Sequence, residues 1–227
     1  MKKWALILVV SAVGTNAFGV QIVSRATLAN LLGVDGQTEN FEGFTFEPLV
    51  QAISLSSNTL DSTTNVLGTG TGKVKVGAQY EAVGAGNSVQ WNNDAYFGLN
   101  SKTIATLNSP TRINYDGLVK GSGVDLHHYV GFLGSNGANL EGNAKFYRNS
   151  TLLGTVDFSL PEAANNSFFL GWFENTGISH VVITATGDYS FTPAMDDHLY
   201  GAEVVPEPAT LAALAIGVGL MRRRNKK

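Results

Sequence analysis

Apolar and polar residues alternate with a period of two in several segments of the chain, which is the pattern of half-buried β-strands. The clearest case is 73–82, where valine, alanine and tyrosine alternate with lysine, glutamine and glutamate. Segments 144–148 and 152–160 flank polar residues and predict a hairpin. Segments 168–173 and 180–186 surround a turn-like stretch at 174–177. Further strands are predicted at 39–46, 94–99, 112–115 and 127–133.

Turn signals separate these segments, among them Asp35-Gly36 and Asp116-Gly117. Many short strands joined by such turns predict an all-β fold, a β-sandwich of the jelly-roll type. One short helix is predicted at 26–32, with Gly33 as its end. The glycine-threonine tract at 68–72 indicates a flexible loop.

The N-terminal residues do not follow the strand pattern. A basic start, Met1-Lys2-Lys3, precedes an apolar run from 4 to 13 and then small residues. This order is typical of a secretory signal peptide, and the apolar run is too short for a spanning helix. Cleavage after Ala17 and cleavage after Gly19 both fit. We therefore expect residues 1–19 to be a helical signal peptide and the protein to be exported.

The C-terminal residues join three physically different pieces. Val205-Pro206-Glu207-Pro208 is predicted to be extended, because each proline fixes its own backbone and restricts the residue before it. A short apolar helix is expected to follow, within an uncharged run of 14 residues from Pro208 to Met221. A stable spanning helix needs about 20 residues. The tail therefore favours a transient, processed address over a permanent anchor.

A basic cluster closes the tail, with Arg222, Arg223 and Arg224 followed by Asn225 and two lysines. Basic residues after an apolar segment stay on the cytoplasmic side of the membrane. The order of motif, apolar helix and arginine cluster resembles the PEP-CTERM sorting signal of exported bacterial proteins. The resemblance implies recognition by an exosortase at the inner membrane and processing at the Pro-Glu-Pro motif. It also implies delivery to the cell surface or extracellular matrix, often in bacteria that make exopolysaccharide.

These ends divide the chain into a signal peptide at 1–19, a β-sandwich body at 20–204 and a sorting signal at 205–227. The body keeps 8 basic and 17 acidic residues, so its net charge is near −9 although that of the whole chain is −3. An acidic surface repels nucleic acid, which we exclude as a partner. The absence of cysteine excludes disulfides, thiolate metal sites and cysteine nucleophiles.

Three carboxylates are candidate calcium ligands. Glu42 lies near the start of the body, and Asp196 and Asp197 lie near its end. The first and last strands of a jelly roll are often neighbours, and clustered carboxylate oxygens suit Ca²⁺. The Phe-Glu and Asp-Asp motifs look like those of adhesion sandwiches, including MAM-type domains, although those domains contain cysteines. The alternative is that the three acids are solvated residues at strand ends.

Trp91 has polar neighbours and is the candidate aromatic for a sugar contact, with an anchoring role in its loop as the alternative. The sequence holds no Gly-x-Ser-x-Gly elbow, phosphate loop or His-Glu-x-x-His motif. The predicted body is therefore a non-catalytic structural protein, or one that binds polysaccharide or Ca²⁺. The alternative is a secreted, glycosidase-like hydrolase that acts on exopolysaccharide with a carboxylate pair.

Overall fold

The computed structural model describes residues 19–84, 86–94, 100–106, 109–128, 139–161, 167–186 and 193–203. The predicted signal peptide up to residue 18, the sorting signal, most of the predicted strand at 94–99 and the end of that at 127–133 lie outside these ranges. Within these ranges, no helix has both the length and the apolar composition required to cross a membrane.

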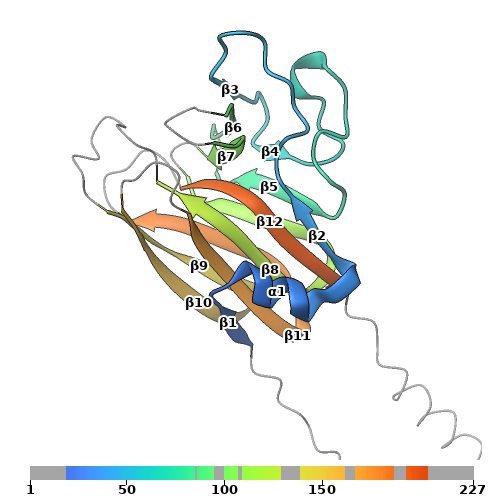
Figure 1. Cartoon of the computed structure of the whole chain (residues 1–227), viewed down its shortest axis with the longest axis vertical. Coiled ribbons are helices and arrows are strands. Elements are labelled where there is room, and N and C mark those ends of the chain that lie inside the picture. The colour runs from blue at the N-terminus through green and yellow to red at the C-terminus, as the bar shows by residue number, and fades with distance from the viewer. Residues whose placement is uncertain are drawn as a thin grey trace, which may run out of the picture.

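The described residues form mostly antiparallel strands with one α-helix (Figure 1). The elements are β1 (Val20–Ile22), α1 (Arg25–Leu32), the 3₁₀ turn η1 (Gly33–Asp35), β2 (Gly36–Glu39), β3 (Ala52–Ser54), β4 (Thr59–Leu60), the 3₁₀ turn η2 (Val66–Gly68), β5 (Ala78–Ala82), β6 (Val89–Asn92), β7 (Thr103–Thr106), β8 (Thr111–His127), β9 (Leu140–Arg148), β10 (Thr151–Leu160), β11 (Phe168–Thr186) and β12 (Ala194–Glu203).

Two long bent strands, β8 and β11, belong to both halves of the sheet. Their pairing is interrupted between Phe173 and Ile178, so each strand has two straight parts. The first half of the sheet has the order β10-β9-β11-β8-β5-β4. In the second half, β1 pairs with β11, β11 with β8, and β8 with β12. Strands that pass between layers through a bend are a known way to build a sandwich.

The main core lies between these two halves. Phe146 on β9 stacks on Trp172 on β11 with ring centroids 5.6 Å apart, although the two residues are not paired in the sheet. Gly154 on β10 provides the space for this contact, because a Cβ atom there would lie 2.1 Å from the Trp172 ring. The inner residues of both halves are therefore packed against each other across the core.

Helix α1 covers the outer face of the second half (Figure 1). Leu28 and Leu32 lie directly over Gly121 and Gly123 of β8, where a Cβ atom would come within 3.0 Å of their side chains. The helix ends at Gly33, whose φ of 60° lies in the left-handed region that favours glycine. The sequence-based prediction of this helix and its end is confirmed.

The all-β prediction is also confirmed, and so is the hairpin of β9 and β10. The jelly-roll connectivity is not found, because β1 pairs with β11 and the last described strand, β12, lies between β8 and β2. The turn predicted at 174–177 is wrong, since this stretch is a bend within β11. The strand predicted at 39–46 is also wrong beyond Glu39, where β2 ends.

Candidate functional site

The pairing of β2 with β12 brings the start and the end of the body together. His198 is the register partner of Glu39, so Glu42 lies in the loop just beyond this pair and near Asp196. Two successive residues, Ser101 and Lys102, each contact one of these acids. The Ser101 hydroxyl donates to the Asp196 carboxylate, and the Lys102 ammonium lies 2.9 Å from Oε2 of Glu42. The backbone N–H of Lys102 donates to Oε1 of Glu42 at 3.0 Å.

Asp196 has an unusual charge environment. Burial raises the pKa of Asp196 to about 6, with further contributions from the charges of Asp197 and Glu42, against hydrogen bonds from Ser101 and the Asp197 N–H. The carboxylates of Asp196 and Glu42 already accept hydrogen bonds from protein groups. Within the part of the chain that the structure describes, no three metal-ligating side chains are grouped closely enough to hold a metal ion. The calcium site at Glu42, Asp196 and Asp197 therefore stays a prediction.

Trp91 does not present its ring to a ligand. The side chain is fully buried, and its Nε1–H donates to the Phe41 carbonyl oxygen at 3.0 Å. The rings of Phe41 and Phe44 pack around it, with centroids 6.5 and 5.6 Å from the Trp91 ring. A fully buried ring offers no face to a sugar, so the structure gives no support to the predicted sugar contact of Trp91. The anchoring alternative is the one observed.

His198 forms a buried polar network that the sequence did not indicate. Its Nδ1 lies 2.8 Å from the Tyr80 hydroxyl and its Nε2 lies 3.0 Å from the Tyr115 hydroxyl. Burial lowers the pKa of His198 to about 3, assisted by the positive charge of Arg25. Burial also raises the pKa of both tyrosines. The four groups, including the Ser122 hydroxyl bound to Tyr115, are therefore neutral at pH 7 and hold the core together.

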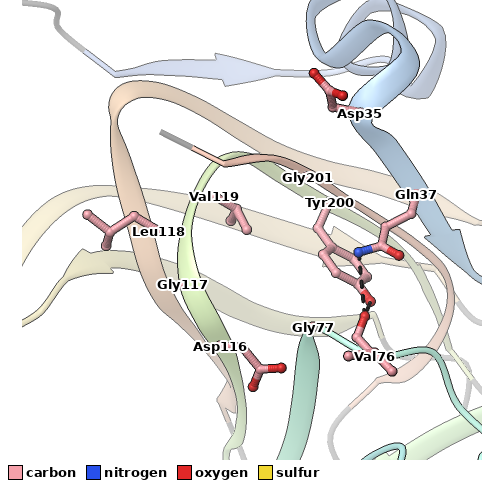
Figure 2. Close-up of a pocket in the computed structure, with 10 residues that line it drawn as sticks. All are labelled: Asp35, Gln37, Val76, Gly77, Asp116, Gly117, Leu118, Val119, Tyr200 and Gly201. Atoms are coloured by element: carbon pink, nitrogen blue, oxygen red, sulfur yellow. Dashed lines mark hydrogen bonds between the residues drawn. The ribbon is translucent and has the colours of Figure 1, made fainter. Parts of the chain in front are cut away.

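A pocket of about 670 Å³ opens where η1, β2, β8 and β12 meet (Figure 2). It is lined by Asp35, Gln37, Val76, Gly77, Asp116, Gly117, Leu118, Val119, Tyr200 and Gly201. In Figure 2, Asp35 and Asp116 lie at opposite ends of the pocket, and Gln37 lies beside Tyr200. The bend of β8 at 116–118 forms one wall, so the same distortion that joins the two halves of the sheet shapes the pocket.

The chemistry of this pocket is polar but not cationic. Asp35, Asp116 and Gln37 are exposed, and Val76 keeps 67% of its surface accessible. The Tyr200 hydroxyl donates to the Val76 carbonyl oxygen at 3.0 Å and fixes one side. None of the described residues that line the pocket is lysine, arginine or histidine. The pocket therefore suits a neutral or cationic ligand with hydrogen-bonding groups and apolar C–H faces.

The sequence does not reveal this pocket, because Asp35-Gly36 and Asp116-Gly117 indicate only turns. The aspartate in each of these pairs is the one feature of the sequence that indicates an exposed polar site here. Only the register that places Gly201 opposite both Gly36 and Gly121 shows that the two turns meet.

The predicted sorting residues Val205, Pro206, Glu207, Pro208 and Arg222–Arg224 lie outside the described residues. Comparison with family models shows that residues 204–225 match the PEP-CTERM protein-sorting motif. No curated protein and no solved structure matches the chain. The match covers the C-terminal tail and not the body. The chain is therefore a PEP-CTERM sorting-domain-containing protein, exported and sorted by an exosortase.

Proposed function

We propose that the body is a non-catalytic cell-surface or matrix protein that binds a neutral polysaccharide in the pocket between Asp35 and Asp116. In this proposal the exosortase processes the chain at the Pro-Glu-Pro motif, and the body is then released beyond the inner membrane. The sorting signal brings the protein to its location, and the pocket on the surface of the body binds the ligand there.

The observation that carries the proposal is the combination of size and lining of this pocket. Its volume of about 670 Å³ falls within the roughly 300–1,000 Å³ of typical small-ligand sites. The carboxylates and the Gln37 amide suit neighbouring sugar hydroxyls, because a carboxylate accepts two hydrogen bonds and an amide both donates and accepts. Val76 and Leu118 offer apolar surface to the C–H faces of a sugar ring. The acidic lining disfavours an anionic polymer.

Affinity electrophoresis tests this proposal, with hydroxyethylcellulose, dextran and galactomannan as neutral polymers and alginate as an anionic one. We expect at least one neutral polymer to retard the protein and alginate not to do so. Asp116→Ala should weaken the retained polymer about tenfold, which corresponds to about 1.4 kcal/mol. The matched control is Asp94→Ala, at an exposed acid outside the pocket. Absence of retardation by all neutral polymers, or equal binding by the Asp116 variant, would overturn the proposal.

The second candidate function is a secreted hydrolase, which the two carboxylates of one pocket favour. Glycoside hydrolysis uses a pair of carboxylates on either side of the scissile bond. Incubation of the protein with the retained polymer distinguishes the two candidates. Binding alone leaves the number of reducing ends constant, whereas a hydrolase increases it and loses this activity in Asp35→Asn and Asp116→Asn.

The proposed calcium site is tested separately by isothermal calorimetry with CaCl₂. Heat of binding in the wild-type protein that is lost in Glu42→Gln would support a site at Glu42, Asp196 and Asp197. Absence of heat would leave these residues with the contacts to Ser101 and Lys102 that the structure shows.

A further inference from the structure

The pocket at Asp116 continues into a second depression of about 170 Å³. Gly77 and Asp116 line both, so the two depressions adjoin at these residues. The second depression is lined on its far side by Asp61, Gln79 and Asn114. A ligand in the first pocket therefore has a direct path across Asp116 onto β5 and β8.

From this depression, a row of polar side chains crosses the outer face of the first half of the sheet. The register aligns Gln79 with Asn114, Asn114 with His180, and His180 with Tyr147. All four are half-buried, whereas one sequence neighbour of each, Tyr80, Ile113, Val181 and Phe146, is in the core. Four strands at a spacing of about 4.8 Å give the row a length of about 14 Å. Helix α1 packs on the other half of the sheet and leaves this row accessible (Figure 1).

The side chains of the row are held in place by neighbouring acids and by stacking within the row. The Gln79 amide donates to Oδ2 of Asp61 at 2.9 Å, and the Asn114 amide donates to Oε2 of Glu81 at 3.2 Å. The rings of His180 and Tyr147 are stacked, with centroids 4.8 Å apart and planes within 7° of parallel. Side chains fixed in this way lose little conformational entropy when a ligand binds.

Two side chains elsewhere on the same face of the sheet carry polar atoms without a hydrogen-bond partner among the described residues. Nε of Arg112 and Oδ1 of Asn143 are shielded from solvent and have no hydrogen-bond partner. Unsatisfied polar groups are uncommon in folded proteins and call for a ligand, a water or a structural reason. Both residues belong to the outer face that carries the row, on β8 and β9.

We infer that the pocket, the second depression and the row from Gln79 to Tyr147 form one continuous track for a linear neutral polysaccharide. This inference rests on the proposed function and specifies its ligand as a polymer, recognised over several sugar units. The pocket binds one part of the chain, and the amides, imidazole and phenol of the row bind successive units across β5, β8, β11 and β9. Neutral groups that both donate and accept hydrogen bonds match the hydroxyls of such a polymer.

Chain-length dependence is the first test. Calorimetry compares disaccharide and hexasaccharide fragments of whichever neutral polymer, hydroxyethylcellulose, dextran or galactomannan, retards the protein most. We expect the hexasaccharide to bind at least about tenfold more tightly than the disaccharide, a gain of about 1.4 kcal/mol. Equal affinities would overturn the track and leave the proposed pocket intact, whereas no binding of any polymer would overturn both.

Substitutions in the row are the second test. The double variant Asn114→Ala/His180→Ala should lose about tenfold in affinity for the hexasaccharide and retain the weaker affinity for the disaccharide. Asn30→Ala, on the exposed face of α1, is the control and should bind as the wild type does. Circular dichroism checks folding, and the single variant Gln79→Ala replaces the double variant if the latter does not fold. Unchanged hexasaccharide affinity in a folded variant would overturn the track.

Discussion

At the scale of single residues, β12 carries two buried titratable groups whose pKa values are shifted for the same reason and with opposite consequences. Burial disfavours the charged form of any group, so it raises the pKa of Asp196 to about 6 and lowers the pKa of His198 to about 3. Burial therefore favours the neutral form of both groups, but at pH 7 only His198 is neutral, because Asp196 ionises as the pH rises through 6. Their contributions to the pH dependence of stability have opposite signs over the same acidic range.

Asp196→Asn should stabilise the protein at neutral pH. The native state binds the proton of Asp196 more tightly than the unfolded chain does, because the folded pKa of about 6 exceeds the ordinary aspartate pKa of 3.8. The contribution of this residue to stability is therefore complete below about pH 4 and is lost as the pH rises through 6. Asparagine removes the charge, and we expect a gain of about 1–2 kcal/mol at pH 7 after solvent screening.

Urea unfolding at a series of pH values measures this effect. The variant should lose the decline in stability between pH 4 and 6 that Asp196 causes in the wild type. Asp94→Asn is the control, since Asp94 is exposed. A decline of the same size in Asp196→Asn would show that Asp196 is not its source.

His198→Phe should destabilise the protein at neutral pH by about 2–4 kcal/mol, because it removes hydrogen bonds to the buried Tyr80 and Tyr115 hydroxyls. The lowered pKa of His198 means that its stability contribution is present above about 6.5 and is lost as the pH falls toward 3. The variant should therefore also be less sensitive to acid. Adding Tyr80→Phe, which removes one unpaired hydroxyl, should recover part of the loss in equilibrium denaturation. A neutral effect of His198→Phe would contradict the role of the network.

At the scale of elements, the contact between β10 and β11 depends on one glycine. A methyl group at Gly154 would overlap the Trp172 ring, which stacks on Phe146. Gly154→Ala should therefore lower the stability by about 1–3 kcal/mol through overpacking. Thermal unfolding and the near-ultraviolet circular dichroism of tryptophan measure the effect, and the exposed neighbour Thr155→Ala is the control. Unchanged stability together with an unchanged tryptophan signal would be inconsistent with this packing.

Local patterns predicted the elements whose ends are set locally. The β9–β10 hairpin turns at Asn149, which adopts a φ of 53°, and α1 ends at a glycine for the same reason. The polar residues in the bend of β11 resemble a turn in the sequence, but their hydrogen bonds are made to each other within the strand. The Glu174 carboxylate accepts hydrogen bonds from the backbone and hydroxyl of Thr176. The pairing of β11 with β8 resumes at Ile178 after its interruption at Phe173, and this long-range register makes β11 one continuous strand.

The candidate sites depend even more on register. The nearness of Glu42 and Asp196 was anticipated from the expected pairing of the two ends of the body, and the β2–β12 register explains it. The pocket combines turns that are distant in the sequence, and no local pattern of hydrophobicity reports such a meeting. The row from Gln79 to Tyr147 draws on four strands, each of which shows only an ordinary alternation of polar and apolar residues.

At the scale of the whole molecule, the sorting signal makes its own prediction. Glu207→Ala, or deletion of Arg222 to Lys227, should leave the protein unprocessed at the inner membrane, because each removes one part of the matched motif. Cell fractionation and the mass of the body measure processing. The pocket variant Asp116→Ala is the control and should be sorted normally. Normal delivery of the truncated chain would contradict the role of the tail.

The place of β12 in the sheet has a consequence for export. This strand pairs with β8 on one side and with β2 and β7 on the other, yet it is formed by the last described residues of the body. An exported chain that crosses the membrane N-terminus first delivers this strand after the other described strands. We therefore expect the sheet to remain incomplete, and the chain to stay unfolded enough to be translocated, until almost all of the body has crossed the membrane. The pairing of β12 with its neighbours then completes the sheet beside the membrane, while the sorting signal is the next segment of the chain to follow.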